Sequence, residues 1–209
     1  MKTYTSVIER FPIIAFIAAG VFGISVVVGT IYTVVTWAYL NGSTGFDDAI
    51  TMLAEFDDVI DYGTVAANLL VTVTLIVVLY RFTSLAAGSA HFTGKHTPYM
   101  AIVGSLVPIL SLFWPLRMYR ALINETAESG RADMIKLSLQ FWIPWAASGL
   151  ISAQAFRMET TLRLAGEAFD IGTFVVVLVA WLFSDILTLV AVLRARVFFA
   201  KLASALDAA

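Results

Sequence analysis

The stretch from Phe11 to Leu40 constrains this chain most, because it contains no charged residue. A bilayer core about 30 Å thick needs roughly 20 consecutive apolar residues in one helix, so this stretch is long enough to cross a membrane with some tilt. Pro12 suits a first helical turn, and Asn41-Gly42 provides a stop. The run is much longer than the apolar region of a signal peptide. We therefore expect a first span that stays in the mature protein.

Three further stretches are nearly free of charge, and each ends at an arginine. They are residues 62–80, 137–156 and 171–193. Of the 209 residues, 60% are hydrophobic and only 13% are charged, whereas soluble domains carry roughly 25% charged residues. One soluble core of this size does not hide so much apolar surface. The sequence predicts an all-α integral membrane helical bundle that forms a single domain over residues 1–209.

Residues 98–115 form a shorter apolar segment that is bounded by Pro98 and Pro115 and interrupted by Pro108. If this segment crosses, there are five transmembrane helices, and the cytoplasmic side holds six of the thirteen Lys and Arg residues. If it is a re-entrant or interfacial helix, eleven face the cytoplasm and two do not. Cytoplasmic flanks collect Lys and Arg. We predict four spans with both termini in the cytoplasm, in the inner (plasma) membrane, and keep five spans as the alternative.

The segment from about 46 to 61 has many acidic residues and no Lys or Arg. Its apolar residues recur at helical spacing, which predicts an amphipathic helix on the extracytoplasmic side. One interpretation is a docking or cation-attracting surface. The other, which we favour, is a helix that caps the bundle and keeps its acidic side chains in water.

The sequence offers few groups for catalysis. It contains no cysteine, which excludes disulfides and thiolate metal sites, and it lacks the common phosphate-binding, zinc-protease and serine-hydrolase motifs. His91 and His96 are expected to be ordinary loop residues. No basic stripe indicates a nucleic-acid partner. We therefore expect no enzyme activity, no cofactor and no bound metal.

Asp185 is the most informative single residue, because it lies within the last predicted span. A charge inside a membrane is costly and usually faces protein or water. One hypothesis is a proton or ion site. The other is a structural role near the cytoplasmic face, where Asp185 pairs with Arg117 or Arg120 in an intramembrane polar cluster, or with Lys136. A buried Asp185 carboxylate that is protonated is a further option.

Aromatic residues near the proline-bounded segment are candidates for contact with lipid or a partner. Trp114 precedes Pro115 and the two arginines, and Trp142 and Trp145 flank Pro144 in the third predicted span. In the first span, small residues at positions 19, 23, 25 and 29 fit the small-x-x-x-small pattern of close helix packing. Packing within the chain is the favoured interpretation of that pattern.

The segment "TPYMAIVGSLVPILSLFWPLRMYRALINET" resembles the signature of a bacterial family of membrane proteins, the domain of unknown function 4328. Residues in step with that signature are Pro98, Pro108, Trp114, Pro115, Met118, Leu122 and Thr126. "LQFWIPWAASGLIS" and "LVAVLRARV" are similar to the spans that follow in the family. The likeness covers about 80–200, and Gly104-Ser105-Leu106 stands where the family has paired aromatic residues. The family implies a polytopic helical fold and no established activity.

Two functional hypotheses follow from these observations. We favour an accessory or regulatory membrane subunit without enzyme activity, which binds other membrane proteins through its helices and is surrounded by membrane lipids. The partner is another membrane protein or a second copy of the chain. The alternative is a small transporter or channel that uses the broken segment 98–115 and Asp185, because broken helices mark transport sites in known folds.

Overall fold

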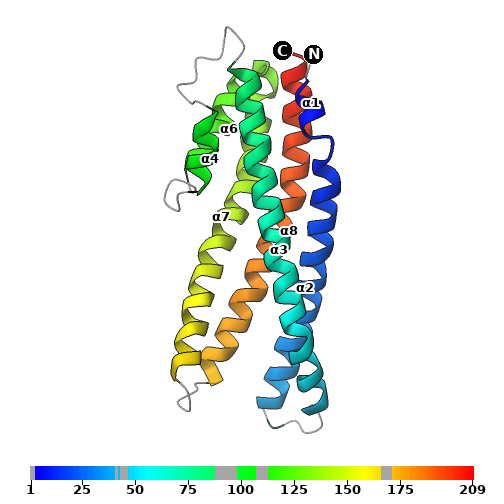
Figure 1. The fold of residues 1–209 in the computed structure, drawn as a ribbon, viewed down its shortest axis with the longest axis vertical. Helices are drawn as coiled ribbons and strands as arrows, with labels where there is room; N and C mark the ends of the chain where they lie inside the picture. The colour runs from blue at the N-terminus through cyan, green and yellow to red at the C-terminus, as the bar shows by residue number, and fades with distance from the viewer. Residues whose placement is uncertain (1–2, 41, 43–46, 88–97, 107–112, 166–170) are drawn as a thin grey trace. The chain divides into compact units, whose positions relative to one another are not determined.

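A computed structural model of the chain describes residues 3–40, 42, 47–87, 98–106, 113–165 and 171–209. Nearly all of these residues are helical, and no strand occurs among them, so the prediction of an all-α chain is confirmed. The long helices are α2 (Phe11–Leu40), α3 (Asp47–Ala86), α7 (Glu128–Ala165) and α8 (Ile171–Asp207) (Figure 1). The shorter ones are α1 (Tyr4–Val7), α4 (Tyr99–Leu106) and α6 (Trp114–Asn124).

Three helical segments in the described part of the chain are long and apolar enough to cross a membrane. They are Tyr4–Tyr39, Tyr62–Ala86 and Gly172–Asp207. They cover nearly all of the first and fourth predicted spans and the whole of the second. The third predicted span lies within α7, which has 38 residues but a more polar composition. Large apolar side chains are exposed along all these helices, including Phe16, Leu69, Leu150 and Phe183. Such surfaces are what lipid-facing helices present.

The predicted acidic helix at 46–61 and the predicted span at 62–80 form one continuous helix, α3, of 40 residues. A helix of that length extends about 60 Å, which is twice the thickness of a bilayer core. The acidic residues ahead of position 62 therefore do not end the helix. Charges interrupt a span inside lipid, but they are compatible with a helix that continues into water.

The contacts within the chain divide it into two compact units. The first unit comprises 1–17, 69–143 and 191–209, and the second comprises 18–68 and 144–190. Every long helix contributes a segment to each unit, and a single domain over residues 1–209 stays a prediction. The first unit holds eleven Lys or Arg and five acidic residues, a formal charge of +6. The second holds two and ten, a formal charge of −8.

An aromatic cluster around Tyr119 forms the core of the first unit. Tyr119 is only 2% exposed, and burial raises the pKa of its phenol. Its ring lies 5.4 to 6.2 Å, centroid to centroid, from the rings of Phe141, Trp142, Phe198 and Phe199. These contacts fix α6 against α7 and α8 within this unit.

The described residues of the proline-bounded segment belong to two helices, α4 and α6. α4 has 8 residues, which extend about 12 Å, and α6 begins at Trp114 with Pro115 in its first turn. Pro108 lies outside the described residues. Neither helix is long enough to cross a bilayer by itself. α4 packs on α6 at Gly104, where a Cβ atom would collide with the Trp114 ring.

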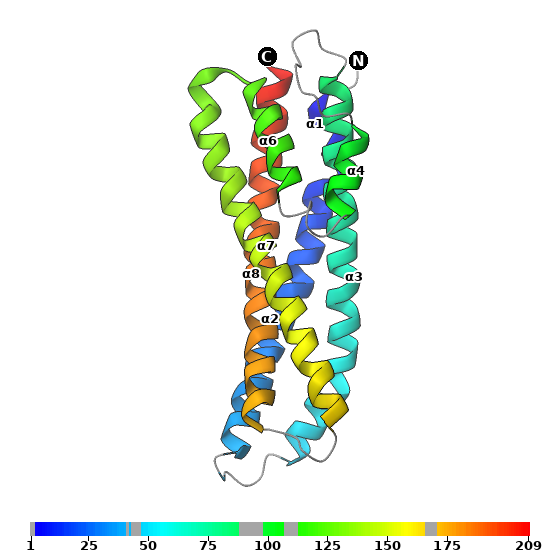
Figure 2. The same cartoon turned by 90° about the vertical axis from the view of Figure 1, so that its left-hand side faces the viewer.

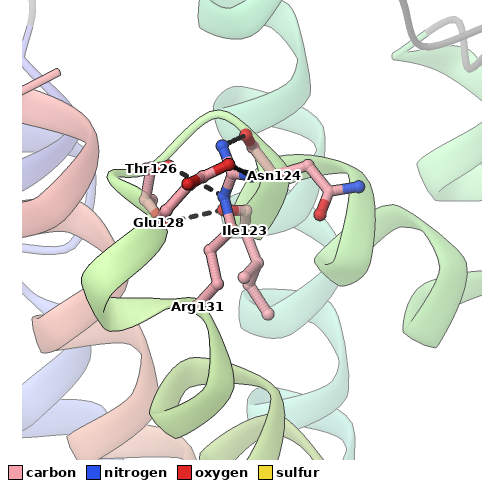
Figure 3. Close-up of polar contacts among 5 residues, drawn as sticks. All are labelled: Ile123, Asn124, Thr126, Glu128 and Arg131. Atoms are coloured by element: carbon pink, nitrogen blue, oxygen red, sulfur yellow. Dashed lines mark hydrogen bonds and ion pairs between the residues drawn. The ribbon is translucent and has the colours of Figure 1, made fainter.

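Arg131 stabilises the turn between α6 and α7 (Figure 3). Its guanidinium donates hydrogen bonds to the carbonyl oxygens of Asn124, at 2.7 Å, and Thr126, at 3.0 Å. It also pairs with Glu128 at 3.7 Å, and the Thr126 hydroxyl donates to the Ile123 carbonyl at 2.7 Å. Carbonyls at a helix end lack partners within the helix, so these contacts complete the end of α6.

Residues near the two ends of the chain lie side by side in the first unit (Figure 2). The Asp207 carboxylate accepts hydrogen bonds from the backbone N–H groups of Tyr4, at 2.7 Å, and Thr5, at 2.9 Å. The Tyr4 ring also packs edge-on against Phe82 at 5.3 Å. Both the first turn of α1 and the last residue of α8 are therefore held in place.

Candidate functional site

Four hydroxyl groups from α7 and α8 meet inside the second unit. Ser148 lies 2.9 Å from Ser184 and 2.6 Å from Thr188, measured between side-chain oxygens. Ser152 lies 2.6 Å from Ser184. We call Ser148, Ser152, Ser184 and Thr188 the hydroxyl cluster. Each of these four side chains forms a hydrogen bond with at least one other member of the cluster.

The spacing of these residues explains why they meet. Ser148 and Ser152 are four residues apart, as are Ser184 and Thr188, and residues at that spacing share one face of a helix. Thr188 also donates to the Ser184 carbonyl at 3.0 Å. An unpaired hydroxyl is costly in an apolar environment. The two faces therefore stabilise the packing of α7 on α8 by satisfying each other.

Asp185 lies beside the hydroxyl cluster but turns towards α2. Its carboxylate accepts a hydrogen bond from the Ser25 hydroxyl, and Ser25 is buried while Asp185 is half-buried. Within the described part of the second unit, no cationic side chain pairs with Asp185. Arg117 and Arg120 are exposed on α6 in the first unit, so the predicted polar cluster is not among the contacts inside either unit and stays a prediction.

Sequence reasoning missed a second carboxylate, that of Glu159. The Trp181 indole N–H donates to Glu159 Oε2 at 3.2 Å, and Trp181 lies one helical turn before Asp185. Glu159 follows Arg157, which marked the end of the third predicted span. Because α7 continues to Ala165, Glu159 still lies on the helix and faces α8. Both carboxylates thus reach the same turn of α8.

The three predicted contact tryptophans have different environments. Trp142 is buried against Tyr119, which places it in the core of the first unit. Trp114 is half-buried beside Gly104, and Trp145 is half-buried in the second unit. Trp114 and Trp145 therefore keep some surface for a contact with lipid or a partner. Trp142 has little exposed surface for such a contact.

The described residues contain no group of three His, Cys, Asp or Glu side chains able to hold a metal ion. His91 and His96 lie outside them. The candidate site is therefore polar, formed by the hydroxyl cluster together with Ser25, Asp185, Glu159 and Trp181. Its hydroxyls can hold helices together, and its two carboxylates can bind a proton or a cation.

Long helices with exposed apolar faces, and with polar side chains such as Ser25, Ser148 and Ser184 paired inside a unit, define a helical integral membrane protein. Residues 46–204 match the family described as a domain of unknown function (DUF4328). The chain belongs to that family, which confirms the resemblance based on the proline-bounded segment. No curated protein and no solved structure matches the chain.

Proposed function

We propose that the protein is a non-enzymatic accessory or regulatory membrane subunit that binds other membrane proteins through its helices. The outward face of α2 supports this proposal. Exposed or half-exposed residues recur there every three or four positions: Ile13, Phe16, Gly20, Gly23, Val27, Thr30, Val34 and Trp37. This is the heptad spacing of helices that pack side by side.

Glycine gives this face its capacity for close contact. Nothing lies within 4 Å of a Cβ atom built on Gly20 or Gly23, and glycine at a helix surface allows another backbone to approach closely in a membrane. Phe16 is 74% exposed directly beside them. Small residues between large exposed apolar side chains therefore favour a transmembrane helix of another protein as the partner.

The proposed arrangement has four crossings, with residues 98–115 re-entrant or interfacial. Because Tyr4 and Thr5 form hydrogen bonds with Asp207, the chain between these residues crosses the membrane an even number of times. The first unit contains both of these segments, α4, α6 and the charge of +6. Since cytoplasmic flanks collect Lys and Arg, we assign the first unit to the cytoplasmic side of the inner membrane.

Site-specific crosslinking tests the subunit proposal. A photoreactive amino acid at Val27, in cells that make the native partner, should give a crosslinked protein adduct that Gly20→Leu with Gly23→Leu abolishes. The matched control is the same probe at Val179, which is exposed on α8. Adducts of equal yield from both positions, or adducts with lipid alone, would contradict the proposal.

A second candidate function is proton or cation transport, which the placement of Glu159 and Asp185 favours. Asp185 lies on α8 one turn after Trp181, whose indole N–H donates to Glu159 of α7. Ionisable residues within spans mark ion pathways in many transporters. In this alternative the hydroxyl cluster lines part of the path. Flux measurements, described below, distinguish it from the subunit proposal.

A further inference from the structure

α6 has one buried face and one basic face. Its buried residues are Pro115, Met118, Tyr119, Leu122 and Ile123. Arg117, Arg120 and Asn124 are exposed, and residues three or four apart share one side of a helix. Because Tyr119 is locked among four aromatic rings, α6 cannot rotate to hide its arginines.

The basic face of α6 has no acidic residue beside it on α6 itself or on α4. Neither α4 nor α6 contains Asp or Glu, and the nearby Glu128 already pairs with Arg131. The whole first unit carries a formal charge of +6. The two arginines are thus available to an anion that comes from outside the chain.

Apolar residues next to the arginines identify the kind of anion. Phe113, which directly precedes α6, is 64% exposed, and Tyr99 at the start of α4 is exposed as well. Aromatic side chains collect at the level of lipid headgroups, and arginine extends from apolar surface towards phosphate. An exposed aromatic ring beside two arginines suits an amphiphilic ligand better than a free ion.

We propose that Arg117 and Arg120 form a binding site for the headgroup phosphate of an anionic phospholipid. The guanidinium group matches phosphate through paired N–H donors, and anionic lipids attract basic segments at the membrane surface. Phe113 then lies against the acyl chains. This inference concerns the lipid around the protein and is independent of the proposed partner helix.

Fluorescence quenching tests the site, because Trp114 lies three residues from Arg117. The full-length protein is reconstituted in phosphatidylcholine vesicles that contain a fixed fraction of brominated phosphatidylglycerol or brominated phosphatidylcholine. The ratio of tryptophan quenching by the two brominated lipids gives the preference for the anionic lipid. The difference between the wild type and Trp114→Phe gives the quenching of Trp114 alone. For Trp114 we expect a preference of at least about fivefold.

Matched variants decide the result. Arg117→Gln with Arg120→Gln should reduce the preference at Trp114 to about onefold, whereas the lysine pair Arg117→Lys with Arg120→Lys should keep most of it. Arg194→Gln with Arg196→Gln, both exposed on α8, should leave it unchanged. The proposal is wrong if the wild type shows no preference or if the glutamine pair keeps it. Binding of an acidic peptide in place of the lipid would also overturn it.

Discussion

Thr5 and Asp207 are joined by two hydrogen bonds, one from the Thr5 backbone N–H at 2.9 Å and one from the Thr5 hydroxyl at 2.5 Å. Both reach the same carboxylate oxygen, across 202 residues of sequence. The two residues must therefore occupy the same side of the bilayer. This relationship carries more information on topology than any single helix does.

Cysteine labelling in intact cells checks the proposed topology. The chain has no cysteine, so single substitutions at Ser6, Ser129, Thr160 and Ser204 report without background. All four positions are exposed. A membrane-impermeant reagent should label only position 160 before the cells are broken. Labelling at 129 and 204 with protection at 160 would instead establish five spans.

The contact between Thr5 and Asp207 should depend on pH. Partial desolvation raises the pKa of Asp207, but the hydrogen bonds from Thr5 and Tyr4 outweigh it and hold the pKa below its ordinary value. A lowered pKa contributes stability above the unfolded value of about 3.9, and this contribution is lost as the pH falls through the folded value. Thermal unfolding in detergent between pH 3 and pH 6 should show this loss. In Asp207→Asn, that part of the pH dependence should be absent.

The hydroxyl cluster should contribute to the packing of α7 on α8. Ser148→Ala removes contacts with both Ser184 and Thr188, and interhelical hydrogen bonds in membranes average about 0.6 kcal/mol each. We therefore expect a loss of about 1 kcal/mol in the free energy of unfolding. Thr160→Ala is the control, because Thr160 donates only to the Phe156 carbonyl of its own helix among the described residues. Equal effects from the two substitutions would argue against the cluster.

Gly104 should tolerate no side chain while Trp114 is present. Gly104→Ala forces the new methyl group into the indole ring, and overpacking typically costs about 1–3 kcal/mol. The double variant with Trp114→Ala should recover part of that loss. Gly130→Ala is the matched control, since nothing lies within 4 Å of a Cβ atom there, and alanine favours a helix by up to about 1 kcal/mol. Unfolding in denaturant gives the free energy of unfolding for the wild type and the three variants.

Flux through liposomes separates the two candidate functions. If the protein conducts protons or cations, Asp185→Asn and Glu159→Gln should each lower the rate by about tenfold or more, because each removes a charge from the path. The subunit proposal expects no flux above that of empty liposomes. A rate that exceeds the background and falls in both variants would replace the subunit proposal with transport.

The sequence predicted those features that depend on local composition. Uncharged stretches located the helices, and a single acid in an apolar run marked Asp185. Its partner Ser25 was not predictable, because 160 residues separate the two and no periodic pattern links them. Arg157 predicts the end of a span, so nothing in the sequence marks Glu159 two residues later. The acidic residues before position 62 predict a separate helix, but they belong to the continuous helix α3.

Tyr119 gives the first unit an internal optical indicator. Of the seven tyrosines in the chain, this one is fully enclosed by other rings, and its raised pKa keeps the phenol from ionising in alkaline solution while that core is closed. Opening of the core releases it, and the tyrosinate absorbance then increases. The increase above the contribution of the other six tyrosines follows the open fraction, without a dye, a label or a substitution.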